Sequence, residues 1–161
     1  MAGTCCLTGH RIIPVGEQEK ILARLRHRVD MLYGQGYRYF GVGGALGFDM
    51  LATDWLLEYK RYHTDIRIIE VLPFPEYRDF WTTEQKNHGA KIDWNADKIV
   101  YCSESSSREA YLVRNRHLVD CSTACISYCT HPAGGTAYTV KYALSRHIPV
   151  YNTSSFDVRM L

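Results

Sequence analysis

Three glycine-containing loops hold the residues of this sequence that could bind a phosphate. Glycine has no Cβ, so a ligand can closely approach the backbone N–H groups beside it. A helix that begins directly after such a loop adds unpaired N–H groups and the positive end of its dipole, and both attract an anion. The sequence therefore predicts a phosphate site built from the segments TGHR (8–11), VGGALGFD (42–49) and THPAGGT (130–136).

The third loop is the strongest candidate for contact with the phosphate itself, because it leads directly into a helix of small residues. A lone Gly-Gly pair can also serve close packing or capping, and that structural interpretation stays open for each loop taken singly. Three such loops at one edge of a sheet favour a ligand. The backbone positions we expect to contact it are Thr8, Gly9, Gly43, Gly44, Gly47, Gly134, Gly135 and Thr136.

Polar side chains beside the loops extend the predicted site. His10 and Arg11 could reach a phosphate or the edge of a base, or could simply be solvated. A helix is predicted over residues 109–121, and because adjacent helical positions do not share a face, at most two of residues 114–116 can face a ligand. We expect Arg114 and Asn115 to do so, and Arg116 to lie on the surface.

Asp49 is the acid within the glycine loops, and three roles are open to it. In the first turn of a helix, a carboxylate is stabilised by the dipole by about 0.3 to 1 kcal/mol, so Asp49 could be a structural cap. It could instead bind a ribose hydroxyl of the ligand. As a carboxylate facing a crevice, it is also the candidate general base.

Strands and helices alternate around these loops. Apolar strand-like segments occur at residues 4–8, 37–42, 65–72, 98–103, 124–129 and 148–152. Helical periodicity separates them, with Ile21, Leu25, Val29 and Leu32 on one face of the first helix. The pattern predicts an α/β fold, a three-layer α/β/α sandwich with a mostly parallel sheet. Ligands bind such sheets beyond the carboxyl ends of the strands.

Residues 74–97 show the weakest pattern in the chain. Trp81, Trp94, Pro75 and Gly89 stand there among many polar residues, which predicts short helices rather than one continuous element. Trp81 could form an aromatic wall for a base or belong to the core. The pattern assigns no role to this segment.

Composition narrows the functional classes. The 161 residues are 46% hydrophobic with a formal net charge of +2, which predicts one globular domain over residues 1–161 and no surface that coats nucleic acid. No signal peptide and no apolar run of about 18 residues is found, so we expect a cytoplasmic protein without a membrane partner. Cysteine and histidine spacings predict reduced core thiols and no metal site. We also expect no cofactor.

Three motifs, in their order along the chain, resemble those of the SLOG superfamily: TGHR, GGALGFDMLA and RNRHLVDCSTACISYCTHPAGGTAYTVKYA (114–143). This Rossmann-like group includes DprA/Smf proteins, LOG phosphoribohydrolases, and YpsA-like and YspA-like proteins, and the chain is most similar to the small stand-alone bacterial members of YpsA type. The resemblance implies a Rossmann-like domain that binds a nucleotide or a nucleotide derivative, such as a phosphosugar or an ADP-ribose-like molecule. It also implies a homodimer, for which apolar helix faces around Trp55 and Tyr111 could supply the interface or could instead cover the sheet.

One departure from the family separates two functions. LOG enzymes continue PGGxGT into glutamates, whereas this chain has Val140 and Lys141 where the acid would lie. Hydrolysis of an N-glycosidic bond needs a group that activates water or protonates the leaving base, typically a carboxylate near the ribose. We therefore expect a nucleotide-binding protein rather than an enzyme. The alternative is a LOG-like hydrolase of nucleoside-phosphate N-glycosides with Asp49 in the missing role, and a weaker alternative is binding of single-stranded DNA.

Overall fold

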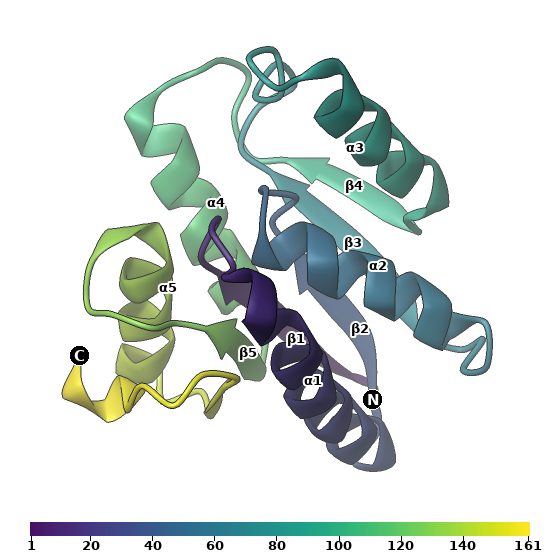
Figure 1. Cartoon of the computed structure of the whole chain (residues 1–161), viewed down its shortest axis with the longest axis vertical. Helices are drawn as coiled ribbons and strands as arrows, with labels where there is room; N and C mark the ends of the chain where they lie inside the picture. Colours follow the sequence, from purple (N-terminus) through teal and green to yellow (C-terminus); the bar gives the residue numbers. More distant parts are fainter.

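A six-stranded parallel sheet forms the middle layer of the protein (Figure 1). The structure is a computed structural model that describes all 161 residues. Every pair of neighbouring strands is parallel, and the order across the sheet is β4-β3-β2-β1-β5-β6. The strands are β1 (Gly3–Gly9), β2 (Tyr37–Val42), β3 (Arg67–Leu72), β4 (Lys98–Tyr101), β5 (Ala124–Tyr128) and β6 (Val150–Asn152).

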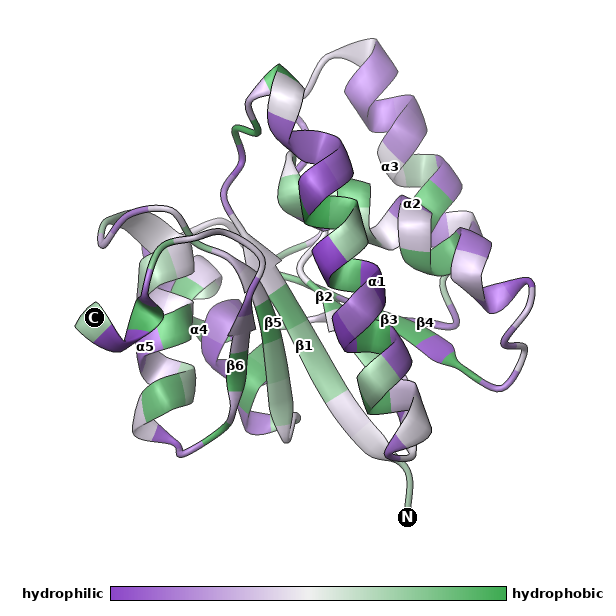
Figure 2. Ribbon diagram, turned by 60° about the horizontal axis from the view of Figure 1, so that its bottom comes forward, coloured by the Kyte–Doolittle hydropathy of each residue, from purple (hydrophilic) through white to green (hydrophobic).

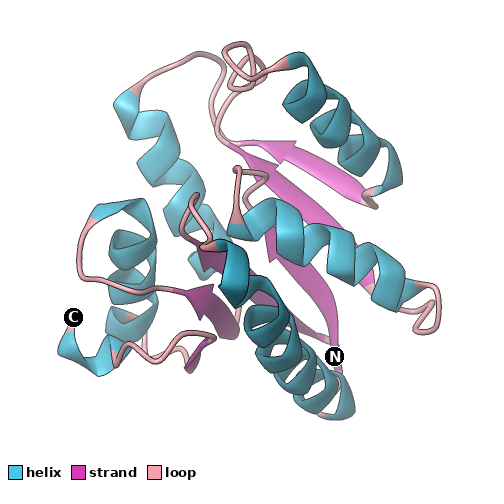
Figure 3. Ribbon diagram, in the orientation of Figure 1, coloured by secondary structure: helices cyan, strands magenta, loops and turns pink.

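Helices cover both faces of the sheet, which confirms the predicted α/β/α sandwich (Figure 3). One face packs against α1 (Gln18–Gly34) and α2 (Phe48–Lys60). The opposite face packs against α4 (Arg108–Asp120) and α5 (Gly134–Ser145). The remaining helix, α3 (Thr83–Asn95), lies beside α2. No helix combines the length and the apolar character that a membrane span requires.

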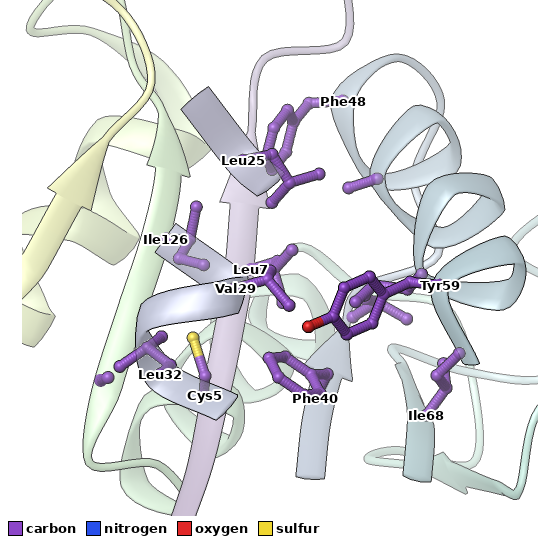
Figure 4. Close-up of a cluster of buried hydrophobic side chains, with 14 of the residues drawn as sticks. Cys5, Leu7, Leu25, Val29, Leu32, Phe40, Phe48, Tyr59, Ile68 and Ile126 are labelled. Atoms are coloured by element: carbon purple, nitrogen blue, oxygen red, sulfur yellow. The ribbon is translucent and has the colours of Figure 1, made fainter. Parts of the chain in front are cut away.

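The larger part of the core lies between the sheet and α1 and α2. The four apolar residues predicted to share a face of α1 are all buried there, together with Leu7 and Phe40 of the sheet and Phe48 of α2. Figure 4 shows three of the four, Leu25, Val29 and Leu32, within this cluster. Apolar colouring follows the central strands, whereas hydrophilic residues gather on the outward sides of the helices (Figure 2). Burial of these side chains, at ~25 cal/mol per Å² of apolar surface, holds α1 and α2 in place above the sheet.

Residues 83–95 form one continuous helix, so the prediction of short helices over residues 74–97 is wrong. The helix begins at a capping box, in which the Thr82 side chain accepts from the Gln85 N–H and the Gln85 side chain accepts from the Thr82 N–H. Such a reciprocal cap satisfies two otherwise unpaired donors. Only Gly89 and Ile92 of this helix are buried, which explains why its apolar period is weak.

The six cysteines are all free thiols. Cys5, Cys6, Cys125 and Cys129 are buried, as predicted for core thiols, and Cys102 is half-buried. Cys121 is exposed, which corrects the prediction for that residue: it follows directly after α4, where the chain turns at the surface.

The strand order places β1 at the centre of the molecule. From β1 the chain builds outward through β2, β3 and β4 on one side, and then crosses to β5 and β6 on the other. The loops that leave β1 and β5 therefore diverge to opposite faces, toward α1 and α5. A crevice forms at such a switch point, beyond the carboxyl ends of the two strands.

Candidate functional site

A cavity of about 300 Å³ lies at this switch point. The three glycine-containing loops meet there, and α4 supplies a further wall. All of the predicted site residues line it except Gly44 and Gly47. The lining residues are Thr8, Gly9, His10, Arg11, Gly43, Ala45, Asp49, Tyr111, Arg114, Asn115, Leu118, His131, Ala133, Gly134, Gly135 and Thr136.

The N-terminus of α5 opens into the cavity without a cap of its own. Ala133 occupies the cap position, no side chain accepts from the first turn, and the first turn contains no acidic residue. Gly134 has a φ of +89°, a conformation that glycine adopts readily, and a Cβ added at this position would contact nothing within 4 Å. The first-turn N–H groups and the positive end of the dipole thus face open space.

Asp49 is a buried carboxyl with a free oxygen. Its side chain lines the cavity but is only 5% exposed, and Oδ1 has no hydrogen-bond partner. Oδ2 accepts from the Ala45 N–H at 3.2 Å. That amide belongs to the loop before α2, so Asp49 does not act as the cap of its own helix. Burial raises the pKa of Asp49 to about 6, against the smaller opposing effects of Arg114 and the Ala45 amide.

Arg114 is the buried cation of the site, at 6% exposure. Its Nη1 donates to the carbonyl oxygen of Gly43, and its Nε donates to Oδ1 of Asn115 at 2.9 Å. Burial lowers the pKa of Arg114, although the guanidinium of an arginine remains charged. Neither of these bonds uses Nη2, which leaves its N–H donors for a ligand.

Arg116 turns away from the cavity, as expected for a position adjacent to a cavity-facing residue. Its guanidinium donates to the Tyr138 hydroxyl at 3.0 Å and to Glu109 at 2.8 Å. Both contacts lie outside the cavity. Arg116 is thus a surface residue of α4, and of residues 114–116 only Arg114 and Asn115 line the cavity.

Gly44 and Gly47 allow loops to pack against one another rather than line the cavity. A Cβ at Gly47 would lie 2.1 Å from the carbonyl oxygen of Arg11, and one at Gly44 would lie 2.5 Å from the Leu72 side chain. These two glycines therefore hold the 43–47 loop against neighbouring segments. We expected ligand contact at both, and the structure gives them a packing role instead.

Several lining residues were not predicted. Tyr111 lies three positions before Arg114 on α4, and this spacing places two side chains on the same helix face. His131 and Ala133 lie in the THPAGGT segment beside the predicted Gly134 and Gly135, and this position in the chain is the signal that could have found them. Trp81 packs with Phe74 and Tyr77 in a separate cluster, so it belongs to the core and forms no wall of the cavity.

The donor set of the cavity suits an anion better than a metal ion. Asp49 is its single carboxylate, and nowhere in the chain do three or more His, Cys, Asp or Glu side chains gather in a way that could hold a metal. Arg11, Arg114 and the α5 N-terminus are all positive. The arrangement can bind a phosphate and, at Asp49, a neighbouring hydroxyl.

Comparison with protein families gives one match over nearly the whole chain. The YspA SLOG family matches residues 8–157. A UPF0398 protein of Staphylococcus aureus is 20% identical over 75 residues. That alignment covers 47% of this chain and 40% of the relative, so the chain matches less than half of the relative's length.

Solved structures share the fold at low sequence identity. DNA processing protein A from Streptococcus pneumoniae has a TM-score of 0.70 at 16% identity, and covers 98% of this chain and 53% of its own. The Helicobacter pylori protein of the same name, described for its single-stranded DNA binding mode, has a TM-score of 0.65 at 17% identity, with 92% and 64% covered. A protein designated TM1055 has a TM-score of 0.58 at 16% identity, with 92% and 72% covered.

Proposed function

This chain belongs to the YspA SLOG family, and from that premise we propose that its cavity binds a nucleotide or a nucleotide-derived phosphosugar. The observation that carries the proposal is buried Asp49, which lines the same cavity as the uncapped N-terminus of α5 and whose Oδ1 has no hydrogen-bond partner in the protein. A buried acceptor without a partner is unfavourable by about 1–3 kcal/mol, so a ligand hydroxyl that satisfies it gains affinity.

The charges in the cavity indicate the polarity of the ligand. Arg11 and Arg114 are cationic, Asp49 is the only anion, and the α5 dipole adds positive potential. A phosphate at Gly134 and Gly135 would meet the positive groups. A ribose hydroxyl beside that phosphate would meet Asp49. The volume of about 300 Å³ fits a phosphosugar, with a base toward the rim.

One observation favours a hydrolase as the second candidate. The pKa of Asp49 is raised to about 6, near the pH at which a general acid or base works best, and the residue lines the cavity with its Oδ1 unpartnered. Asp49 could thus protonate a leaving base or activate water at an N-glycosidic bond. The binding proposal stands first because Val140 and Lys141 occupy the place of the LOG glutamate.

A thermal-shift panel tests the binding proposal. Nucleoside mono-, di- and triphosphates, ADP-ribose and ribose 5-phosphate are compared with the corresponding nucleosides. A ligand at 100 times its dissociation constant adds about 2.7 kcal/mol of stability, and we expect that gain only from phosphorylated compounds. Stabilisation by an oligo-dT strand but by no mononucleotide would favour single-stranded DNA binding instead. Absence of any stabilisation would refute the proposal.

Chromatography of the same mixtures tests the second candidate. We expect every nucleotide to be recovered intact after incubation with the wild-type protein. Release of free base by wild type, but not by Asp49→Asn, would establish the hydrolase and overturn the preference for binding alone.

A further inference from the structure

His10 joins all three glycine-containing loops. Its backbone N–H donates to the carbonyl oxygen of Tyr128, at the end of β5, at 3.1 Å. Its backbone carbonyl accepts from the N–H of Phe48, the first residue of α2, at 3.1 Å. Its imidazole Nε2 accepts from the N–H of Thr130, in the loop that leads to Gly134, at 2.9 Å. Of these three bonds, only the last depends on the side chain.

The bond from Thr130 requires a neutral imidazole. Nε2 can accept a hydrogen bond only while it carries no proton, so the ring proton of His10 lies on Nδ1. Protonation would place an N–H at Nε2, facing the N–H of Thr130. The two donors would repel, and the side-chain connection between the loops would break.

A second histidine ring lies directly against that of His10. The rings of His10 and His131 are stacked, with centroids 4.2 Å apart and planes 11° from parallel. Nδ1 of His131 accepts from the Ala133 N–H at 3.3 Å, so this ring is neutral too in the observed arrangement. Burial, and to a smaller extent the neighbouring His131, lower the pKa of His10.

We propose that neutral His10 is a proton-sensitive latch, which holds the 130–133 loop against the β1–α1 loop and so positions Gly134 and Gly135 to receive an anion. His10 is therefore a positioning residue, which acts through the bond to Thr130. The anion-binding part of this inference rests on the proposed function, whereas the latch itself does not.

The latch and simple charge attraction predict opposite effects of acidification on anion binding. The ionisable and charged groups around His10 are His131, Tyr128, Arg11, Asp49 and Arg114. On acidification, protonation of either histidine or of Asp49 makes the cavity more positive, which by itself strengthens anion binding. Opening of the latch displaces the Gly134 loop, which weakens anion binding. Weaker binding at acid pH is therefore evidence for the latch.

Nuclear magnetic resonance of the free protein tests the latch without any ligand. Long-range ¹H–¹⁵N spectra at pH 7.5 are expected to show the Nδ1–H tautomer for His10. The amide shift of Thr130 should titrate with the same midpoint as the His10 ring, below the ordinary value of 6.5. An Nε2–H tautomer, or a Thr130 amide that ignores the titration of His10, overturns the proposal.

Sulfate binding then tests the consequence for the cavity, because sulfate remains a dianion between pH 5.5 and 7.5. We expect the affinity of wild type for sulfate to be about fivefold lower at pH 5.5 than at pH 7.5, as for the loss of one hydrogen bond. His10→Gln offers a permanent acceptor to Thr130, so only the charge effect remains, and its affinity for sulfate should rise as the pH falls to 5.5 and Asp49 becomes protonated. His10→Phe keeps a ring but no acceptor, and should bind weakly at both.

His88→Gln is the matched control, since His88 pairs with Asp54 outside the cavity and its loss should leave the pH dependence of wild type intact. Equal pH dependence in wild type and His10→Gln, or tighter sulfate binding by wild type at pH 5.5, overturns the latch. If no variant binds sulfate at pH 7.5, the anion site itself is wrong, and the tautomer and Thr130 titration alone decide whether the latch exists.

Discussion

Arg114 on α4 donates a hydrogen bond to the carbonyl oxygen of Gly43, at the loop that follows β2. The missing side chain of Gly43 leaves room for both charged groups of the site. A Cβ there would lie 2.8 Å from Oδ2 of Asp49 and 3.1 Å from Nη1 of Arg114. Asp49 and Arg114 are thus neighbours that form no direct ion pair, so each keeps hydrogen-bonding capacity for a ligand.

Substitution of Gly135 should separate binding from folding. A Cβ at Gly135 meets only Nδ2 of Asn115, at 3.8 Å, so Gly135→Val should change the free energy of unfolding by less than about 1 kcal/mol. The added methyl groups would occupy the space of the phosphate, and we expect no stabilisation by any nucleotide. Gly34→Val, at the end of α1 and outside the cavity, is the control that should still bind. Undiminished ligand binding by Gly135→Val would place the phosphate elsewhere.

Removal of the buried guanidinium should weaken ligand binding. Arg114→Ala loses a charge-assisted contact to phosphate, which is worth about 1.5 to 3 kcal/mol, or roughly 10- to 150-fold in dissociation constant. Calorimetric titration with the tightest nucleotide of the panel measures the loss. Arg116→Ala changes the same helix outside the cavity and should bind like wild type. Equal losses in the two variants would point to damage to α4 rather than to a phosphate contact.

Asp49 should make stability depend on pH below neutrality. Its pKa in the folded protein is raised from 3.8 to about 6, so its contribution to stability is fully present below pH 3.8 and is lost as the pH rises through about 6. Asp49→Asn removes this contribution, and its stability relative to wild type should improve by ~3 kcal/mol between pH 3.5 and 7. Urea unfolding at several pH values measures the difference. The exposed Asp79→Asn should follow wild type throughout, and if Asp49→Asn does so too, the raised pKa is wrong.

Glu70 should also make the stability of the protein fall as the pH rises, but over a higher pH range than Asp49. Its side chain is fully buried beside Arg78, which bridges it to Asp93. Burial, together with the Asp93 carboxylate, raises the pKa of Glu70 from 4.5 to about 8. Stability from this group is full below pH 4.5 and is lost as the pH rises through about 8. Between pH 6 and 9, the free energy of unfolding of wild type should fall by on the order of 2 kcal/mol more than that of Glu70→Gln. Glu76→Gln, at an exposed position, serves as the control.

We also expect the chain to form a homodimer. The face of α2 around Trp55 is the stronger of the two predicted interfaces, because Tyr111 lines the cavity, whereas Trp55 is half-buried outside it and stacks on the buried Tyr59. Light scattering should give twice the chain mass of 18.5 kDa at micromolar concentration. Trp55→Glu should shift the protein to monomer, whereas Tyr62→Glu, on an exposed residue just beyond α2, tests whether any added charge nearby does the same. A monomeric wild type refutes the expectation.

The sequence by itself determined most of the strands and helices and the three glycine-containing loops. Alternating apolar segments predict the strands, and the spacing of Ile21, Leu25, Val29 and Leu32 predicts the buried face of α1, because these patterns depend on neighbours along the chain. The capping box at Thr82 and Gln85 was also present in the sequence, although the weak apolar period of α3 concealed it. The same local logic placed Arg114 and Asn115 together on one helix.

The tertiary structure decided which of these residues meet and what state they adopt. Strand order depends on packing between distant segments, and only that order brings Gly43, Asp49 and Arg114 to one cavity. The raised pKa of Asp49 follows from burial, which no local pattern reports. Gly44 and Gly47 look like ligand-contact positions in sequence, yet they pack against Leu72 and Arg11 because the loops fold over one another. The bond between His10 and Thr130 spans residues 120 positions apart, so only the folded chain could show it.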